Sequence, residues 1–419
     1  MEEWKEYKLM NICTELSDGL HKAPKFVSGG DYIFVNAKNI SNGFIVDNDP
    51  TKKSTYEEYV KYSSPLNETT VLYSIDGTIG NIALYRGEKC ILGKGACYLN
   101  PNPTKLDRMY LYYELQAPHF KLYIDKMSTG STIKHISLKT MRNYEMKVPS
   151  INTQQRIVSI LKSLDDKIEV NRRINENLEQ QAQALFKSWF VDFEPFRDGE
   201  FEESELGRIP KGWRVAKIKD IPHTLNTGKR PKGGAITSGV PSIGAEQLKG
   251  LCNYDYAKTK YISKDYSQSI PKGKVIGYEV YLNRVGGKPG DYIQNTTMFG
   301  EGYPYENCYI NDHVFKLDFM QNRGYNVYIY FTFLTSRIRK YLNACGGKAA
   351  IPVINKQNID DIYVFLPENE YVIKFGKSVL PIMNIILKNG LESARLAELR
   401  DTLLPRLMSG ELKVDEVNV

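Results

Sequence analysis

Two stretches of the chain carry a seam of mostly apolar side chains at alternating steps of three and four residues. The first seam comprises Leu161, Leu164, Ile168, Asn171, Asn175, Leu178, Ala182, Leu185 and Trp189. The second comprises Phe375, Val379, Ile382, Ile386, Asn389, Ser393, Leu396, Arg400, Leu403 and Leu407. A seam with this seven-residue period predicts a long α-helix that packs against another helix.

The second stretch is a copy of the first, because a shift of 218 residues aligns the two seams. The same shift extends upstream of both helices, where it lays one set of residues over another: Ile133, Ile136, Met141, Tyr144, Met146 and Pro149 over Ile351, Ile354, Ile359, Ile362, Val364 and Pro367. An internal repeat of this length predicts two copies of one structural plan.

The first helix is expected to start at Asn152, with Gln155 three residues later as a capping signal, and to run to about Phe190. At ~1.5 Å per residue it would measure about 58 Å. The second is expected from about Glu370 to Leu407, with three points at which it could bend or end early: Gly376, Gly390 and Pro405.

The simplest way to bury each apolar seam is to pack it against the seam of the other copy. Two polar layers, Asn171 with Asn175 and Asn389 with Ser393, fall in mid-seam and could fix the register. The alternative is a polar patch at a frayed centre. A pseudo-two-fold axis between the copies would make the pair antiparallel, with the globular parts at opposite ends, whereas a parallel pair would put them side by side.

Short β-rich runs alternate with turns before each helix. They include Thr70 to Ser74, Asn81 to Tyr85 and Val314 to Leu317, and each copy also has one helix-like stretch, Tyr110 to Met127 and Tyr325 to Cys345. Trp4 corresponds to Trp213, and Val71-Leu72-Tyr73 is matched with Val275-Ile276-Gly277.

The predicted fold class is therefore α+β. Two mixed α/β domains are separated by two long helices that pair as an antiparallel coiled coil. The predicted ranges are 1–150 for the first domain, 151–198 for the central helix, 199–368 for the second domain, and 369–419 for the C-terminal helix and tail.

Composition excludes several classes. No run is long and apolar enough to cross a membrane, and the charged start contains no signal-peptide core, so the chain is expected to stay in the cytoplasm. Its six cysteines form no metal-binding spacing and are interpreted as structural thiols. The net charge of +7 is uneven, because residues 206–367 hold 23 basic and 12 acidic residues. This balance favours a polyanionic partner.

The sequence contains no complete catalytic motif. The segment Gly87 to Gly95 has the wrong spacing for a phosphate-binding loop and lacks its Ser/Thr, so a hairpin turn is the preferred interpretation. There is no G-x-S-x-G or H-E-x-x-H sequence, and the histidines occur singly. No metal site is expected.

Polar and basic loops recur at matching places in both copies. They are 74–80 with 283–288, and 128–136 with 346–351, and the densest basic cluster lies in 227–234. Each alone could be a solvated turn, but their recurrence favours nucleic-acid contact. The candidate DNA-binding residues are Thr129, Ser131, Thr132, Lys134, His135, Lys139, Lys229, Arg230, Lys232, Arg284, Lys288 and Lys348.

At these residues the chain resembles the specificity (S) subunits of type I restriction-modification systems. The resemblance is carried by GSTIKHISLKTMRNYEMKVPSINTQQRIVSILKSLDDKIE, LFKSWFVDFEPF, ESELGRIPKGW and LAELRDTLLPRLMSGEL. It implies two target-recognition domains, each reading one half of a bipartite DNA site, and conserved helices that set the spacer and bind modification subunits. The first copy departs from the pattern, since only Glu3-Trp4 stands where the second has Ile209-Pro210-Lys211-Gly212-Trp213.

The resemblance further implies that the chain has no catalytic residues and holds no cofactor. The expected partners are double-stranded DNA, two modification (methyltransferase) subunits and two restriction subunits, with S-adenosylmethionine, ATP and magnesium bound in those subunits. The alternative function is a coiled-coil scaffold that joins protein partners without binding DNA.

Overall fold

The computed structural model describes residues 4–49, 52–130, 134–319, 322–347 and 350–417. It contains two compact units. Unit 1 comprises Met1–Asp166 and Leu396–Val419, and unit 2 comprises Lys167–Arg395. These units group residues by proximity, so each includes part of both long helices. The four ranges predicted from the repeat follow the chain instead and stay a prediction.

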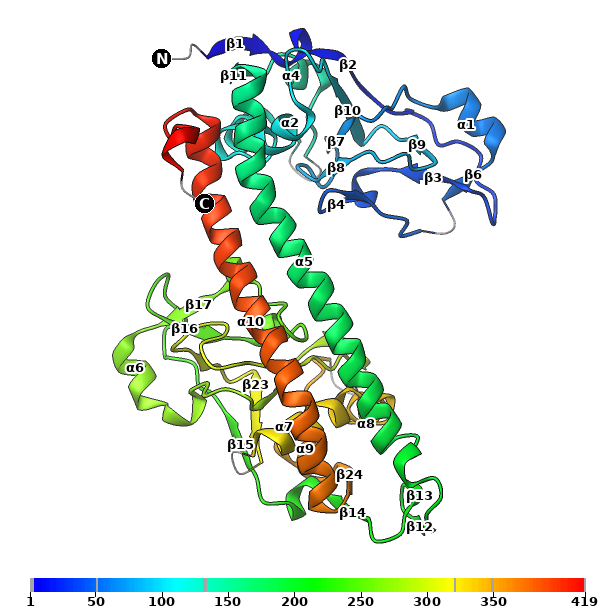
Figure 1. Cartoon of the computed structure of the whole chain (residues 1–419), viewed down its shortest axis with the longest axis vertical. Coiled ribbons are helices and arrows are strands. Elements are labelled where there is room, and N and C mark those ends of the chain that lie inside the picture. Colours follow the sequence, from blue (N-terminus) through cyan, green and yellow to red (C-terminus); the bar gives the residue numbers. More distant parts are fainter. Residues whose placement is uncertain (1–3, 50–51, 131–133, 320–321, 348–349, 418–419) are drawn as a thin grey trace. The chain divides into compact units, whose positions relative to one another are not determined.

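The two predicted long helices are confirmed as α5 (Ile151–Phe190) and α10 (Asn369–Met408), whose ends lie 218 residues apart (Figure 1). The predicted start signal is wrong by two residues. Ser150 precedes the first turn, and its Oγ accepts a hydrogen bond from the backbone N–H of Thr153 at 3.4 Å. Asn152 therefore lies inside the helix, where it cannot act as the cap.

The helix α10 continues past Gly376, Gly390 and Pro405 to Met408, so the expected early end does not occur. In unit 2 the two glycines allow close packing. A Cβ on Gly376 would lie 2.6 Å from the Cα of Gly324, and a Cβ on Gly390 would lie 2.5 Å from the Sγ of Cys252. Contacts this short leave no room for a side chain, which explains why helix-weakening residues stand there.

The helices are antiparallel within each unit. In unit 2, Asn171 Nδ2 donates to Ser393 Oγ at 3.3 Å, and Asn389 Nδ2 donates to Asn175 Oδ1 at 2.9 Å. In unit 1, Arg400 Nη1 donates to Asp165 Oδ1 at 2.7 Å. The predicted polar layers thus face each other.

The predicted seam residues are buried or half-buried, and most of them also pack into the core of their own unit. They are Leu161, Leu164, Ile168, Asn171, Leu178, Leu185, Val379, Ile382, Ile386, Asn389, Leu396 and Leu403. The apolar stripes therefore contact globular cores as well as the partner helix.

Unit 1 is built on a four-stranded sheet in the order β2-β10-β7-β8 and a three-stranded sheet in the order β6-β3-β9. The fully buried β7 lies between two antiparallel neighbours, while β3 and β9 are parallel. The strands are β1 (Lys5–Lys8), β2 (Cys13–Asp18), β3 (Tyr32–Val35), β4 (Ile40–Ser41), β5 (Phe44–Ile45), β6 (Lys53–Ser54), β7 (Val71–Ser74), β8 (Ile82–Leu84), β9 (Cys90–Leu92), β10 (Ala96–Pro101) and β11 (Glu145–Val148). The shorter helices are α1 (Tyr56–Tyr62), α2 (Arg108–Glu114), α3 (Pro118–Met127) and α4 (Leu138–Arg142).

Unit 2 repeats this plan with the orders β15-β23-β18-β21 and β17-β16-β22, in which β16 and β22 are parallel. Its strands are β12 (Phe201–Ser204), β13 (Gly207–Pro210), β14 (Arg214–Lys217), β15 (Thr224–Thr227), β16 (Val240–Ile243), β17 (Lys260–Ile262), β18 (Val280–Asn283), β19 (Gly287–Lys288), β20 (Asp291–Tyr292), β21 (Thr296–Met298), β22 (Tyr309–Ile310), β23 (Val314–Asp318) and β24 (Tyr363–Leu366). Its shorter helices are α6 (Lys264–Ser269), α7 (Arg323–Leu334), α8 (Ser336–Gly346) and α9 (Lys356–Asp360).

The shared topology corrects two details of the sequence alignment. The counterpart of β7 is β18, so matching Val71-Leu72-Tyr73 with Val275-Ile276-Gly277 is wrong by five residues. Each predicted helix-like stretch is two helices, α2 with α3 and α7 with α8. The first break precedes Pro118, whose ring is accommodated at the start of α3.

None of the helices in the described ranges is long and apolar enough to span a membrane.

Candidate nucleic-acid interface

Two of the predicted loops of unit 1 meet at the end of the buried strand β7. The backbone N–H of Ile136 donates to the carbonyl of Ile75 at 2.8 Å, and the N–H of Gly77 donates to the carbonyl of Lys134 at 3.2 Å. Thr129 and His135 form a two-way backbone bridge, with N···O distances of 3.1 and 2.9 Å. This pairing brings the candidate residues Thr129, Lys134 and His135 to one surface.

Unit 2 contains the same loop arrangement. The N–H of Ile354 donates to the carbonyl of Arg284 at 3.0 Å, and the N–H of Gly286 donates to the carbonyl of Pro352 at 3.3 Å. Ile136 and Ile354 are equivalent in the repeat, and so are the ends of β7 and β18. The paired loops therefore belong to the shared plan and are not an accident of one copy.

Arg230 and Arg284 converge on one short segment of unit 2. The guanidinium of Arg230 lies 3.0 Å from Asp312 Oδ1 and 3.1 Å from His313 Nδ1, while the N–H of Arg284 donates to the carbonyl of His313 at 2.7 Å. The loop 227–234 thus reaches the paired loops through Arg230.

The remaining candidates are dispersed. Lys229, Lys232 and Lys288 are exposed, the last in the hairpin of β19 and β20. Lys139 is exposed on α4, beside β2. Ser131, Thr132 and Lys348 lie outside the described residues.

Comparison with known proteins covers the whole chain. Residues 1–180 match the family model described as the type I restriction modification DNA specificity domain. The chain is 27% identical to the type I restriction enzyme MjaIX specificity subunit of Methanocaldococcus jannaschii, over 99% of this chain and 95% of that one. It is 25% identical to the HindI specificity subunit of Haemophilus influenzae, over 98% of this chain and 100% of that one.

The chain is thus similar, over nearly its whole length, to proteins named as specificity subunits of type I restriction enzymes. The fold agrees with this similarity. The crystal structure of the S subunit of the type I restriction-modification system from M. genitalium matches with a TM-score of 0.58 at 17% identity, over 97% of this chain and 96% of that one.

A basic hollow in unit 1 was missed by sequence reasoning. Three lysines, Lys38, Lys52 and Lys94, line a hollow of about 440 Å³ together with the loop that carries Asp76 and Thr78. Lys38 and Lys94 are exposed and have no ion-pair partner among the described residues, whereas Lys52 lies 3.2 Å from Asp49. The lysines are far apart in sequence, and only the parallel pairing of β3 with β9 brings two of them together.

The one available signal was Lys94, which stands between two glycines in the segment rejected as a phosphate-binding loop. The segment still lacks the spacing of a nucleotide-binding motif. The exposed lysine on a tight turn is nevertheless suited to binding a phosphate.

The equivalent surface of unit 2 carries different charges. In both units the parallel strand pair is followed by a backbone hydrogen bond of the same length, 2.8 Å, which aligns the two surfaces residue by residue. In this alignment Glu246 corresponds to Lys38, and Asp312 corresponds to Lys94. Glu246 lies 3.1 Å from Lys260. Partial burial opposes the charge of Glu246, but a backbone hydrogen bond and Lys260 outweigh it and lower its pKa. The two surfaces thus differ in charge although they share a backbone plan.

No group of His, Cys, Asp and Glu suited to a metal ion occurs in the described part of the chain. The six cysteines are free thiols, and burial raises the pKa of Cys90 and Cys308 to about 12. Thiols that stay protonated at neutral pH are poor nucleophiles and poor metal ligands.

Proposed function

We propose that the chain is a type I specificity subunit that recognises a bipartite DNA site, with unit 1 reading one half-site and unit 2 reading the other. The observation that carries the proposal is the paired loop at the end of β7 and of β18. The same backbone arrangement occurs twice, but it presents different side chains in the two units. Two copies of one reader with different surfaces suit an asymmetric site with two different halves.

Affinity and sequence reading would come from different side chains. The exposed lysines of the hollow and of the loop 227–234 can contact phosphates, which adds affinity without sequence information. Base edges require positioned donors and acceptors. Thr129 is exposed, and His135 and Arg284 are half-buried at the paired loops, which makes their side chains suitable candidates.

The long helices would fix the distance between the half-sites. Half-sites about one helical turn apart, ~34 Å, face the same side of the duplex. The helix pair is suited to this task because its buried polar layers define one antiparallel register.

The outer helix face would bind the modification subunits. Val170 and Ile174 lie one turn apart on α5 and are 47% and 41% exposed. Arg172 and Arg173 both contact Glu169 at 2.7 Å, so the surrounding charges are already paired within the helix. An exposed apolar strip whose neighbouring charges are already paired is a suitable surface for a partner helix.

The chain itself would be non-catalytic. Two modification subunits and two restriction subunits would bind S-adenosylmethionine, ATP and magnesium, and this chain would bind none of them. It supplies the DNA address on which those subunits act.

The test is a map of methylated adenines in cells that carry the complete system, compared with cells in which this chain is deleted. The proposal expects one motif with two specified blocks separated by unspecified positions, and no such motif after deletion. A methylation pattern that persists without the chain, or a motif with one continuous block, would refute it.

A further inference from the structure

Trp4 and Trp213 occupy equivalent positions in the two units. Each precedes a strand that pairs antiparallel with the last strand of its unit, β1 with β11 and β14 with β24. Their surroundings can therefore be compared position by position.

In unit 2 the indole of Trp213 is covered by aromatic rings. The centroids of Phe193 and Phe196 lie 5.4 and 5.0 Å from that of Trp213, both edge-on. Phe365 and Tyr371 pack against these phenylalanines at 5.7 and 4.6 Å. Trp213 is only 3% exposed as a result. The covering segment, Asp192 to Phe196, alternates carboxylates with aromatic rings.

Unit 1 lacks these rings. Phe193 and Gly410 are the left-handed residues that follow α5 and α10, with φ of 54° and 74°. The equivalents of Phe365 and Tyr371 are Lys147 and Thr153. A Cβ on Gly410 would lie 3.1 Å from the Trp4 ring, so the glycine backbone lies directly against the indole.

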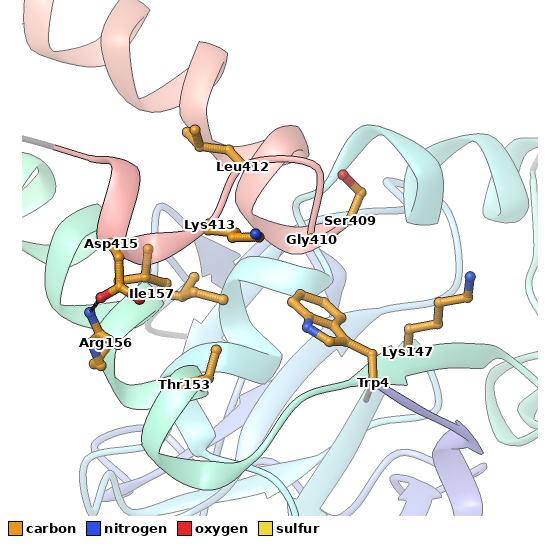
Figure 2. A pocket seen from close by; sticks show the side chains of 11 residues that line it. Trp4, Lys147, Thr153, Arg156, Ile157, Ser409, Gly410, Leu412, Lys413 and Asp415 are labelled. Atoms are coloured by element: carbon orange, nitrogen blue, oxygen red, sulfur yellow. Dashed lines mark hydrogen bonds and ion pairs between the residues drawn. The ribbon is translucent and has the colours of Figure 1, made fainter. Parts of the chain in front are cut away.

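The missing rings leave a pocket of about 500 Å³ beside Trp4. Figure 2 shows the indole next to the turn at Gly410 and the ion pair of Arg156 and Asp415 across the pocket. Lys147 and Lys413 also line it, and neither has an ion-pair partner among the described residues. The pocket combines an aromatic wall with two unneutralised cations.

We propose that this pocket binds an aromatic side chain flanked by carboxylates, presented by a segment of a partner protein. The indole offers a surface for edge-to-face ring contact, and the two lysines suit neighbouring carboxylates. The segment Asp192 to Phe196 is the precedent for the ring contact, since its phenylalanines cover the equivalent indole of unit 2 from within the chain. The inference is independent of DNA recognition and survives its failure.

The probe is a fluorescein-labelled peptide of sequence DFEPF, copied from residues 192–196, whose binding to the full-length chain is followed by fluorescence anisotropy. Saturable binding is expected. The matched control peptide DAEPA should bind about tenfold more weakly or worse, because a central aromatic ring commonly contributes at least ~1.4 kcal/mol. Absence of saturable binding, or equal binding of both peptides, would overturn the proposal.

Two variants locate the site. Gly410→Phe should place a ring against the Trp4 indole, which the glycine backbone contacts, and reduce binding about tenfold. Lys147→Glu with Lys413→Glu changes only exposed side chains and should also weaken binding, which keeps the test valid if Gly410→Phe unfolds. Unchanged affinity in the folded variants contradicts the assignment. Binding that appears only after residues 1–3 are removed would also contradict it, because the chain itself would then occupy the pocket.

Discussion

Replacement of Gly376 by Ala tests how closely α10 packs against α7 in unit 2. At an exposed helix position, glycine makes the helix about 1 kcal/mol less stable than alanine does, so helix propensity alone predicts that the substitution stabilises unit 2. The structure predicts the opposite sign. The new Cβ would lie 2.6 Å from the Gly324 Cα, whereas carbon atoms in contact are normally about 3.5–4.0 Å apart.

The helices must therefore separate by roughly 1 Å, since no flexible side chain can yield at a contact between two glycine backbones. Overpacking of this kind costs up to about 3 kcal/mol, and the gain in propensity offsets about 1 of it. We expect Gly376→Ala to lower the unfolding free energy of unit 2 by ~2 kcal/mol.

The assay is urea unfolding followed by tryptophan fluorescence in a Trp4→Phe background, in which the remaining Trp189 and Trp213 both report on unit 2. Gly390→Ala is the matched control, because its Cβ would lie 2.5 Å from the side chain of Cys252, which, unlike the backbone of Gly324, a second substitution can remove. That clash should be relieved by Cys252→Gly, which also suits the left-handed φ of 56° at that residue. A more stable Gly376→Ala variant would refute the packing argument.

Three further predictions concern DNA contact and pH. Alanine at Lys38, Lys52 and Lys94 should weaken binding to cognate and unrelated DNA alike and reduce the slope of log K against log salt by about 2, because Lys52 is already paired with Asp49 and the other two would each neutralise one phosphate; an unchanged slope in filter-binding assays excludes the hollow from the interface. Alanine at Lys229, Arg230 and Lys232 should also reduce the slope by about 2, because Arg230 is already paired with Asp312; the same titration decides whether that loop is a solvated turn. A hydrogen bond to the buried carboxylate of Glu114 raises the pKa of His119 above its ordinary 6.5 despite partial burial, so its contribution to stability is fully present below pH 6.5 and is lost as the pH rises through the folded-state pKa. His119→Gln should therefore destabilise unit 1 most at acidic pH in thermal unfolding, and a loss that grows with pH would contradict this sign.

Local patterns predicted the helical part of the fold well. The seams of α5 and α10 are periodic over 40 residues each, so their existence and their antiparallel polar layers follow from the sequence. The failures concern contacts between distant segments. Gly376 and Gly390 look like helix breakers until Gly324 and Cys252 are placed beside them, and β18 was misplaced because its short buried strand resembles the neighbouring apolar run.

The residues of the candidate interface were likewise predicted only in part. The loops with Thr129, His135 and Arg284 were found because they recur in both copies. Lys38 and Lys52 carry no local signal, since strand pairing alone brings them to the hollow. Sequence patterns therefore located the repeated backbone but not the side chains that gather on it.

The central claim is that two units read separate half-sites at a distance set by the helices. Its most direct test is the methylated-adenine map of the intact system compared with one in which a seven-residue repeat is removed from the middle of both α5 and α10. At ~1.5 Å per residue the deletion shortens each helix by about 10 Å, which corresponds to about three base pairs. The account predicts unchanged half-sites separated by a spacer about three base pairs shorter. Methylation at the original spacing, or altered half-site sequences, would contradict it.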